Sequence, residues 1–245
     1  MNATKDRLRD YYDRNATVYE VKHGVTLPGH EHNFARHYGP FLRDAIPEGS
    51  NVLEIGCGTG VYTRWLLNRG CRVVAMDISG NILAKARERC PEATLVQGDC
   101  EDPAVSLPEG VLGAGFDVIL GVNTFCYYPH KAAALERYRR LLRPHGRVVL
   151  LDMNGACPLY RVMSWMDRNE IRTSYADVRQ STVGTLCQLA EDAGFEVRKL
   201  TRFAFLPNGI GSSAVRVLRP FDSALGRLPF ADRYAMRVGL VAEGR

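Results

Sequence analysis

The sequence lacks several features that would assign a protein to a class at once. No run of about 18 apolar residues occurs, so a membrane-spanning helix is not expected. The seven cysteines are scattered and form no C-x-x-C pair, which argues against a disulfide framework or a zinc cluster. The opening residues MNATKDRLRD lack the apolar stretch of a secretory signal. Together these absences favour a cytoplasmic protein with reduced thiols.

The charge is only mildly unbalanced. There are 32 basic and 27 acidic residues, for a formal net charge of +5. An excess of positive charge can attract anionic ligands or a membrane surface, but no basic block is interleaved with aromatic residues. Nucleic-acid binding is therefore not expected. The length of 245 residues is ample for one domain with a sizeable core.

The chain divides into three parts by its pattern of apolar residues. Residues 1–47 have amphipathic helical spacing and predict a helical cap. Residues 48–155 alternate apolar runs with helical segments, which predicts a parallel sheet that forms the cofactor-binding half. Residues 156–245 predict a helix, two further strands and an amphipathic insert at 208–230 that Pro220 interrupts. We interpret the whole chain, 1–245, as one domain whose last part faces the substrate.

The stretch VLEIGCGTGVYT, residues 52–63, carries the strongest signal. A buried strand runs into Gly56, Gly58 and Gly60, and then a helix begins. Glycines at such a turn adopt positive φ and let a ligand approach the backbone, and the helix start adds free N–H groups. A dinucleotide site would have G-x-G-x-x-G, whereas here the third glycine comes one residue early.

Two acids follow the next strands. Asp77 ends the second predicted strand, where a carboxylate can accept hydrogen bonds from ribose hydroxyls. Asp99 ends the third, where it could accept from an adenine amino group. The carboxyl ends of parallel strands are the edge at which open α/β sheets bind ligands. The glycine turn and both acids therefore predict a nucleoside-like ligand.

These motifs closely resemble the class I S-adenosylmethionine-dependent methyltransferases. LEIGCGTG is similar to their first motif, VVAMDIS to the second, LVQGDCED to the third, and FDVILGVNTFCYYP to the fourth strand. The resemblance covers roughly residues 11–155 and continues weakly beyond them. It implies an α/β, doubly wound Rossmann-like sheet of seven mostly parallel strands in the order 3-2-1-4-5-7-6. It also implies that the last strand is antiparallel and that the cofactor is S-adenosyl-L-methionine.

The resemblance also implies a set of cofactor-binding residues. Glu54 would order the glycine loop, and Asp77 and Ile78 would hold the ribose and flank the adenine. Val122 and Asn123 would lie near the reacting end, and Tyr19 would close over the cofactor. The full implied set is Tyr19, Glu54, Gly56, Cys57, Gly58, Gly60, Asp77, Ile78, Asp99, Cys100, Glu101, Val122 and Asn123.

The sequence leaves the catalytic base open. Methyl transfer from a sulfonium needs an in-line acceptor and exclusion of water, and a base only where the acceptor must lose a proton early. Several relatives that act on hydroxyls have a histidine just after the fourth strand, where this chain has Cys126 and Tyr127. The aromatic wall of a pocket is an alternative role for Tyr127, and a turn cap is one for Asp152. The candidates are His30, His32, Tyr127, His130 and Asp152.

Four of the six histidines lie within residues 23–37, in the predicted cap. No metal is expected there, since methyl transfer requires none. His30 or His32 could instead supply a base or a contact to the acceptor from the cap.

The sequence therefore predicts a methyltransferase acting on oxygen or nitrogen of a small biosynthetic acceptor. One alternative has the segment 212–230 on a membrane, collecting a lipid or quinone acceptor. For that segment we favour a helix packed on the sheet. A second alternative, an NAD(P)-dependent oxidoreductase, is disfavoured by the glycine spacing and by Asp99. A third is a cofactor-binding regulator without transfer. The identity of the acceptor and the oligomeric state stay open.

Overall fold

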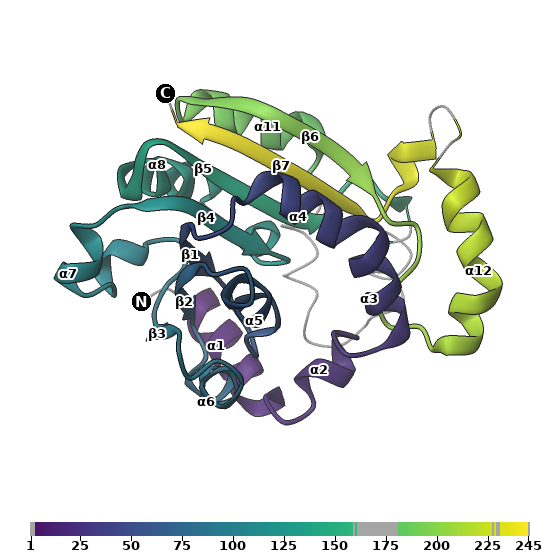
Figure 1. The fold of residues 1–245 in the computed structure, drawn as a ribbon, viewed down its shortest axis with the longest axis horizontal. Coiled ribbons are helices and arrows are strands. Elements are labelled where there is room, and N and C mark those ends of the chain that lie inside the picture. The colour runs from purple at the N-terminus through teal and green to yellow at the C-terminus, as the bar shows by residue number, and fades with distance from the viewer. Residues whose placement is uncertain (1–2, 159, 161–180, 227, 229–230, 245) are drawn as a thin grey trace.

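The computed structural model describes residues 3–158, 160, 181–226, 228 and 231–244 (Figure 1). Its centre is one seven-stranded sheet in the order β3-β2-β1-β4-β5-β7-β6, as the sequence predicted. Strand β7 runs antiparallel to both of its neighbours, and the other neighbouring strands are parallel. The strands are β1 Asn51–Ile55, β2 Arg72–Asp77, β3 Thr94–Gln97, β4 Phe116–Val122, β5 Leu142–Met153, β6 Phe195–Phe203 and β7 Arg237–Gly244.

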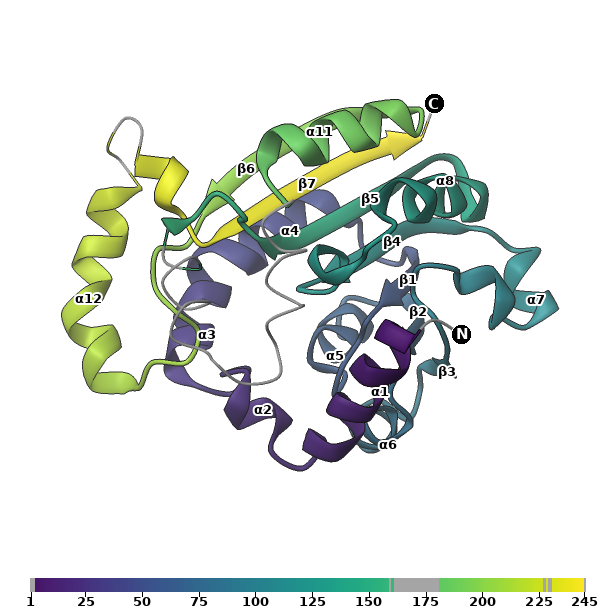
Figure 2. The ribbon, with the colours of Figure 1, turned by 180° about the vertical axis from the view of Figure 1, so that it is seen from behind.

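Helices cover both faces of the sheet, which explains why its central strands are almost wholly apolar. Every residue of β1 is buried, and so is every residue of β2 after Arg72. Helices α8 (Lys131–Leu141) and α11 (Val183–Asp192) pack on one face, which Figure 2 shows in front. Helices α4 (Gly39–Ala45), α5 (Val61–Leu67) and α6 (Gly80–Arg89) pack on the other. Burial on both faces is what the continuous apolar runs require.

The N-terminal part is helical, and it lies along the edge of the sheet where β1, β2 and β4 end (Figure 1). A π-helical turn joins α3 to α4, so the chain continues in a helical conformation from Pro28 to Ala45. The elements are α1 Ala3–Asn15, α2 Tyr19–Lys22, α3 Pro28–Asn33 and the π-helix η1 Phe34–Tyr38. Four short helices connect other elements: η2 Pro103–Val105, α7 Glu109–Leu112, η3 Phe125–Tyr127 and η4 Ala231–Tyr234.

The amphipathic insert departs from the sequence prediction. Helix α12, Ser212–Leu225, runs through Pro220 without interruption, and it stands beside α3 instead of packing on the sheet (Figure 1). Its apolar side chains Val217, Leu218, Phe221 and Leu225 are between 36% and 65% exposed, whereas Asp222 is 1% exposed. Our interpretation as a helix packed on the sheet was therefore wrong. Apolar spacing predicts one face of a helix but does not say what covers that face.

The described helices were also searched for membrane spans. Among them, none combines the length and the apolar character that crossing a bilayer requires.

Candidate active site

The glycine loop after β1 has the backbone that its sequence predicted. Gly56, Gly58 and Gly60 have φ values of +67°, +55° and +79°. A Cβ atom on Gly56 would lie 2.2 Å from Oγ1 of Thr124, and one on Gly58 would lie 3.2 Å from the Tyr19 hydroxyl. The loop therefore needs glycine both for its left-handed backbone and for the close approach of neighbouring side chains.

A cavity opens beside this loop, at the carboxyl ends of β1, β2 and β4. Nine of the residues implied for the cofactor line it: Tyr19, Gly56, Asp77, Ile78, Asp99, Cys100, Glu101, Val122 and Asn123. Residues that the sequence reasoning did not single out for the cofactor complete the wall: Lys5, Leu8, Tyr12, Ile82, Thr124, Tyr127, Tyr128 and Pro129. The structure thus brings together most of the expected set, although each residue's role toward a ligand remains a prediction.

Asp77 fastens the glycine loop to β2. Its carboxylate accepts hydrogen bonds from the backbone N–H of Gly58 at 2.9 Å and of Ser79 at 3.0 Å. Burial raises the pKa of Asp77, and these backbone hydrogen bonds partly offset that rise. The same carboxylate forms part of the cavity wall, where it can accept a further hydrogen bond from a ligand.

Glu54 lies beneath the loop and is not part of the cavity wall. The Thr63 hydroxyl donates to its Oε2 at 2.6 Å, which ties β1 to the first turn of α5. Burial raises the pKa of Glu54 to about 8 despite this hydrogen bond. Cys57, Gly58 and Gly60 also lie outside the cavity wall, and the Cys57 thiol contacts the carbonyl oxygen of Gly58 at 3.7 Å.

Helix α1 closes one side of the cavity through Lys5. Its ammonium group lies 2.5 Å from a carboxylate oxygen of Asp99 and 2.5 Å from one of Glu101. Burial lowers the pKa of Lys5, but the two carboxylates outweigh this effect and raise it overall. The sequence reasoning missed Lys5, because a single basic residue in a polar N-terminal helix gives no local signal of a partner 94 residues away.

The cavity offers acceptor atoms that suit the predicted cofactor. The side-chain oxygen of Asn123 is buried and has no hydrogen-bond partner among the described residues. Asn123 also has a positive φ of +51°, held by its N–H bond to the carbonyl oxygen of Leu151 at 2.8 Å. A free acceptor at the end of β4, together with the acids after β2 and β3, fits an ammonium, a ribose and an adenine along one edge.

The candidate bases lie in different surroundings. Tyr127 lines the cavity. His130 is exposed, and its backbone N–H donates to Glu101 at 3.0 Å. Asp152 is fully buried outside the cavity wall, and it accepts from the N–H of Thr124 at 3.0 Å. Burial raises its pKa to about 6. Asp152 thus holds the turn after β4, which matches the alternative role of a turn cap.

The histidine cluster separates into distinct environments. His30 is buried, with Nε2 3.0 Å from the Tyr62 hydroxyl, and burial together with the charge of Arg237 lowers its pKa to about 4. His23 packs against Tyr19 with ring centroids 4.6 Å apart, and its buried Nε2 has no partner among the described residues. The sequence reasoning gave His23 no role of its own.

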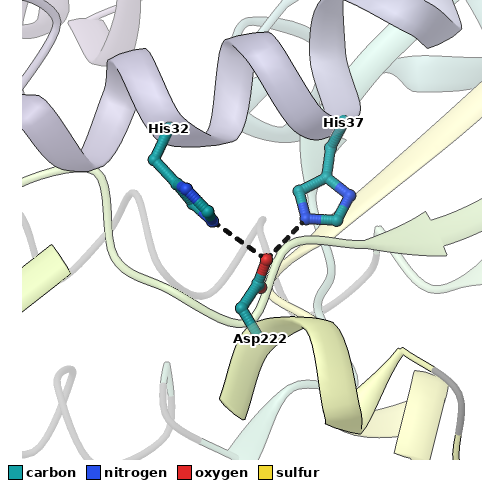
Figure 3. A group of neighbouring side chains, drawn as sticks. All are labelled: His32, His37 and Asp222. Carbon is teal, nitrogen blue, oxygen red and sulfur yellow. Dashed lines mark hydrogen bonds and ion pairs between the residues drawn. The ribbon is translucent and has the colours of Figure 1, made fainter. Parts of the chain in front are cut away.

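His32 and His37 converge on Asp222 of α12 (Figure 3). Their Nε2 atoms lie 3.1 Å and 2.9 Å from the same carboxylate oxygen. The three ligating atoms lie within 4.8 Å of one another, a spacing that a metal ion could also use. As hydrogen bonds, the two contacts attach α12 to the segment formed by α3 and η1. Residues 190 and 185 apart in the chain are thereby joined at one carboxylate.

Comparison with known families gives a match in the part of the chain that carries the glycine loop. A family model described as "Methyltransferase domain" matches residues 53–150, which run from within β1, through the glycine loop and β2 to β4, into β5. The chain is 26% identical over 167 residues to a ubiquinone biosynthesis O-methyltransferase of Aeromonas salmonicida, covering 65% of this chain and 68% of that one. It is 30% identical over 155 residues to a dTDP-3-amino-3,6-dideoxy-alpha-D-glucopyranose N,N-dimethyltransferase of Streptomyces fradiae, covering 61% of this chain and 57% of that one.

Solved structures agree on the fold. An S-adenosylmethionine-dependent methyltransferase from Mesorhizobium loti superposes with a TM-score of 0.60 at 20% identity, covering 83% of this chain and 96% of the other. A magnesium protoporphyrin IX methyltransferase from Synechocystis PCC 6803, with bound S-adenosylhomocysteine, gives 0.63 at 15% identity, covering 98% and 100%.

Proposed function

We propose that this chain is an S-adenosylmethionine-dependent methyltransferase that methylates oxygen or nitrogen of a small organic acceptor, since a methyltransferase family model matches residues 53–150 and the sheet has the strand order of the class I enzymes. One observation carries the proposal. A glycine loop with three positive φ values opens into a cavity whose wall includes Asp77, Asp99 and Asn123. The homologues named for quinone and sugar substrates support the class of acceptor.

In this proposal the cofactor supplies an electrophilic methyl group, and the chain supplies position and a dry site. Asp77 would accept hydrogen bonds from the ribose hydroxyls, since its carboxylate lies at the end of β2, beside the glycine loop and in the cavity wall. Asp99 would accept from the adenine amino group, and Asn123 from the amino group of the methionine end. Tyr19 and Tyr127 would bound the reacting end, and their rings would exclude water from the transfer.

A strong base is not part of the proposal. His30 has a pKa of about 4, so it is neutral at pH 7 and binds a proton only weakly. It can still accept a hydrogen bond and orient an acceptor hydroxyl or amine. Positioning of the acceptor within about 3–3.5 Å of the methyl carbon then supplies most of the rate.

Calorimetry tests the cofactor and a transfer assay tests the reaction. We expect S-adenosylhomocysteine to bind with one-to-one stoichiometry and NADH to show no heat. Asp77→Asn should weaken that binding by at least about tenfold, because it removes a charged acceptor from the wall. Asp117→Asn is a matched control, since Asp117 lies at the opposite end of the sheet and pairs with Arg143. Binding of NADH without S-adenosylhomocysteine would refute the proposal.

A second candidate places the acceptor in a membrane. Helix α12 supports it, because Val217, Phe221 and Leu225 are exposed beside Arg216 and Arg219. The chain should then sediment with vesicles containing anionic lipid at low salt, and Phe221→Ser should reduce the bound fraction. Val105→Ser is the control, since Val105 is 81% exposed on η2. No sedimentation of the unmodified chain would remove this candidate and leave the first intact.

A further inference from the structure

Arg237, the first residue of β7, is a buried cation with no anionic partner in the part of the chain that the structure describes. It is 8% exposed, and it makes no ion pair with a carboxylate among the described residues. Its Nη1 atom donates to the carbonyl oxygen of Met236 at 3.2 Å and to the Tyr160 hydroxyl. Its Nε atom is buried and has no hydrogen-bond partner within the described ranges. Both atoms that it contacts belong to uncharged groups.

A buried guanidinium in such surroundings needs an explanation. Transfer of a charge from water into a protein interior costs several kcal/mol unless an opposite charge or a full set of hydrogen bonds replaces the water. Arginine cannot escape this cost by losing its proton. A ligand that brings a negative charge would offset this cost, and the planar fork of N–H groups suits a carboxylate or a phosphate.

The surroundings of Arg237 are aromatic and hydroxyl-bearing. The groups that act most strongly on its pKa, after burial, are the phenols of Tyr160, Tyr38, Tyr62 and Tyr127. The Tyr38 hydroxyl donates to the side-chain oxygen of Asn208 at 3.0 Å. Burial raises the pKa of Tyr38, Tyr62 and Tyr160 above the usual value near 10, so these three phenols are neutral at pH 7 and provide hydrogen bonds but no charge.

The residues around Arg237 adjoin the cofactor cavity. Tyr127 lines the cavity and also packs against the cluster that contains Tyr160 and Met236, next to Arg237. Tyr62 belongs to α5, the helix that begins directly after the glycine loop, and its hydroxyl lies 3.0 Å from His30. The charge of Arg237 acts on His30 as well. The guanidinium thus lies on the far side of Tyr127 from the cofactor residues, where an acceptor would enter.

We infer that Arg237 binds an anionic oxygen group of the acceptor, so that the substrates are organic acids or phosphate esters with a hydroxyl or amine to be methylated. The inference rests on the proposed function and narrows it. The anion accepts hydrogen bonds from the guanidinium, whose Nε has no partner among the described residues, beside the Tyr160 hydroxyl. The nucleophilic end of the acceptor then extends past Tyr127 toward the methyl group. Arg237 acts as a specificity residue and does not take part in the transfer.

The test uses the full chain saturated with S-adenosylhomocysteine and three small probes, titrated by calorimetry at pH 7. Benzoate carries a carboxylate, phenyl phosphate carries a phosphate, and benzamide is the neutral match of benzoate. We expect one of the two acids to bind saturably and benzamide to bind at least about tenfold more weakly. The stronger acid identifies the anion that the site prefers.

Substitutions separate Arg237 from general charge effects. Arg237→Met should weaken acid binding by at least about thirtyfold, as expected for removal of one partner of a buried charge pair. Arg237→Lys keeps the charge but loses the fork of N–H groups. Its affinity for the acid should therefore lie between that of the unmodified chain and that of Arg237→Met. Arg202→Met removes an equal charge from the neighbouring strand β6, where Arg202 pairs with Asp232, and should change nothing.

The outcomes are distinguishable. Acid binding that is lost in Arg237→Met and retained in Arg202→Met, with unchanged affinity for S-adenosylhomocysteine, supports the inference. Two results overturn it while the proposed function stands: neither acid binds, or Arg237→Met binds the acid as tightly as the unmodified chain. If Arg237→Met fails to fold, Arg237→Lys decides, because acid binding equal to that of the unmodified chain would show that the fork is not used. Failure of S-adenosylhomocysteine to bind at all refutes the proposed function itself.

Discussion

Substitution of Gly56 by alanine is the sharpest test of how the glycine loop works, because the chain contains its own control. Gly56 and Gly70 have nearly the same φ, +67° and +73°. An L-residue in this conformation costs roughly 1–2 kcal/mol. A Cβ atom on Gly70 would meet nothing within 4 Å, whereas one on Gly56 would lie 2.2 Å and 2.4 Å from two atoms of Thr124. Only Gly56→Ala therefore combines strain with a steric clash.

The clash adds a cost that the structure allows us to bracket. Thr124 cannot turn away freely, since its hydroxyl contacts the carbonyl oxygens of Val122 and Gly56 and its N–H donates to Asp152. Overpacking at such a site costs about 1–3 kcal/mol. We expect Gly70→Ala to lower the free energy of unfolding by about 1–2 kcal/mol, from strain alone. Gly56→Ala should lower it by roughly 2–5 kcal/mol, from strain and overpacking together.

Urea denaturation followed by circular dichroism gives the stabilities, and calorimetry gives the affinity for S-adenosylhomocysteine. Affinity should fall strongly for Gly56→Ala and stay unchanged for Gly70→Ala. In a double-mutant cycle, Thr124→Gly should recover part of the stability lost in Gly56→Ala. Equal stability and equal affinity in the two alanine variants would refute the reasoning, because strain would then be the whole effect.

Three further predictions concern buried carboxyl groups and α12. Folded Glu54 keeps its proton up to about pH 8 while the unfolded chain loses it near 4.5, so the protein should lose stability as pH rises between these values. Glu54→Gln should remove about 3 kcal/mol of this loss in the free energy of unfolding at pH 7. If the pH profile of stability is the same in Glu54→Gln as in the unmodified chain, the loss does not come from Glu54. The pKa of Asp222 shifts in the opposite direction, to about 2 in the folded chain against 3.8 in the unfolded chain. Ionised Asp222 therefore stabilises the fold above pH 4, and this stabilisation fades as the pH falls. The difference in free energy of unfolding between the unmodified chain and Asp222→Asn should therefore shrink from about 2 kcal/mol at pH 5 to roughly half at pH 3, and a constant difference would exclude ionisation as its source. Pro220→Ala should slow amide hydrogen exchange across α12, since proline inside a helix costs about 3 kcal/mol; unchanged exchange would mean that the helix opens elsewhere.

The sheet and the glycine loop could be predicted because their signals are local. The central strands β1, β2 and β4 are short apolar runs, and the positive φ of Gly56, Gly58 and Gly60 suits the residue type that the sequence has there. The strand order came from the resemblance of these motifs to a family, and the structure confirmed it. Local pattern also identified α12 as amphipathic but misplaced it, because the pattern is silent about what the helix contacts.

The remaining features of the site depend on contacts between distant residues. Lys5 reaches Asp99 across 94 positions, and His32 reaches Asp222 across 190. Arg237 looks in the sequence like an ordinary charge at the edge of a strand. Only the fold reveals that it is buried among phenols, with no carboxylate partner in the described segments. Such pairings leave no periodic trace in the sequence, so they require the folded chain to be seen.

The position of β7 has a consequence for how the protein is made. This strand follows β6 in the chain yet lies between β5 and β6 in the sheet. While the ribosome still holds the C-terminal segment, β5 and β6 both expose unpaired backbone edges, the kind of surface on which growing chains associate wrongly. By then strands β1 to β4 can already pair with one another, and the glycine loop can form between β1 and α5. The proposed acceptor site, which includes the first residue of β7, can form only after β7 has been made.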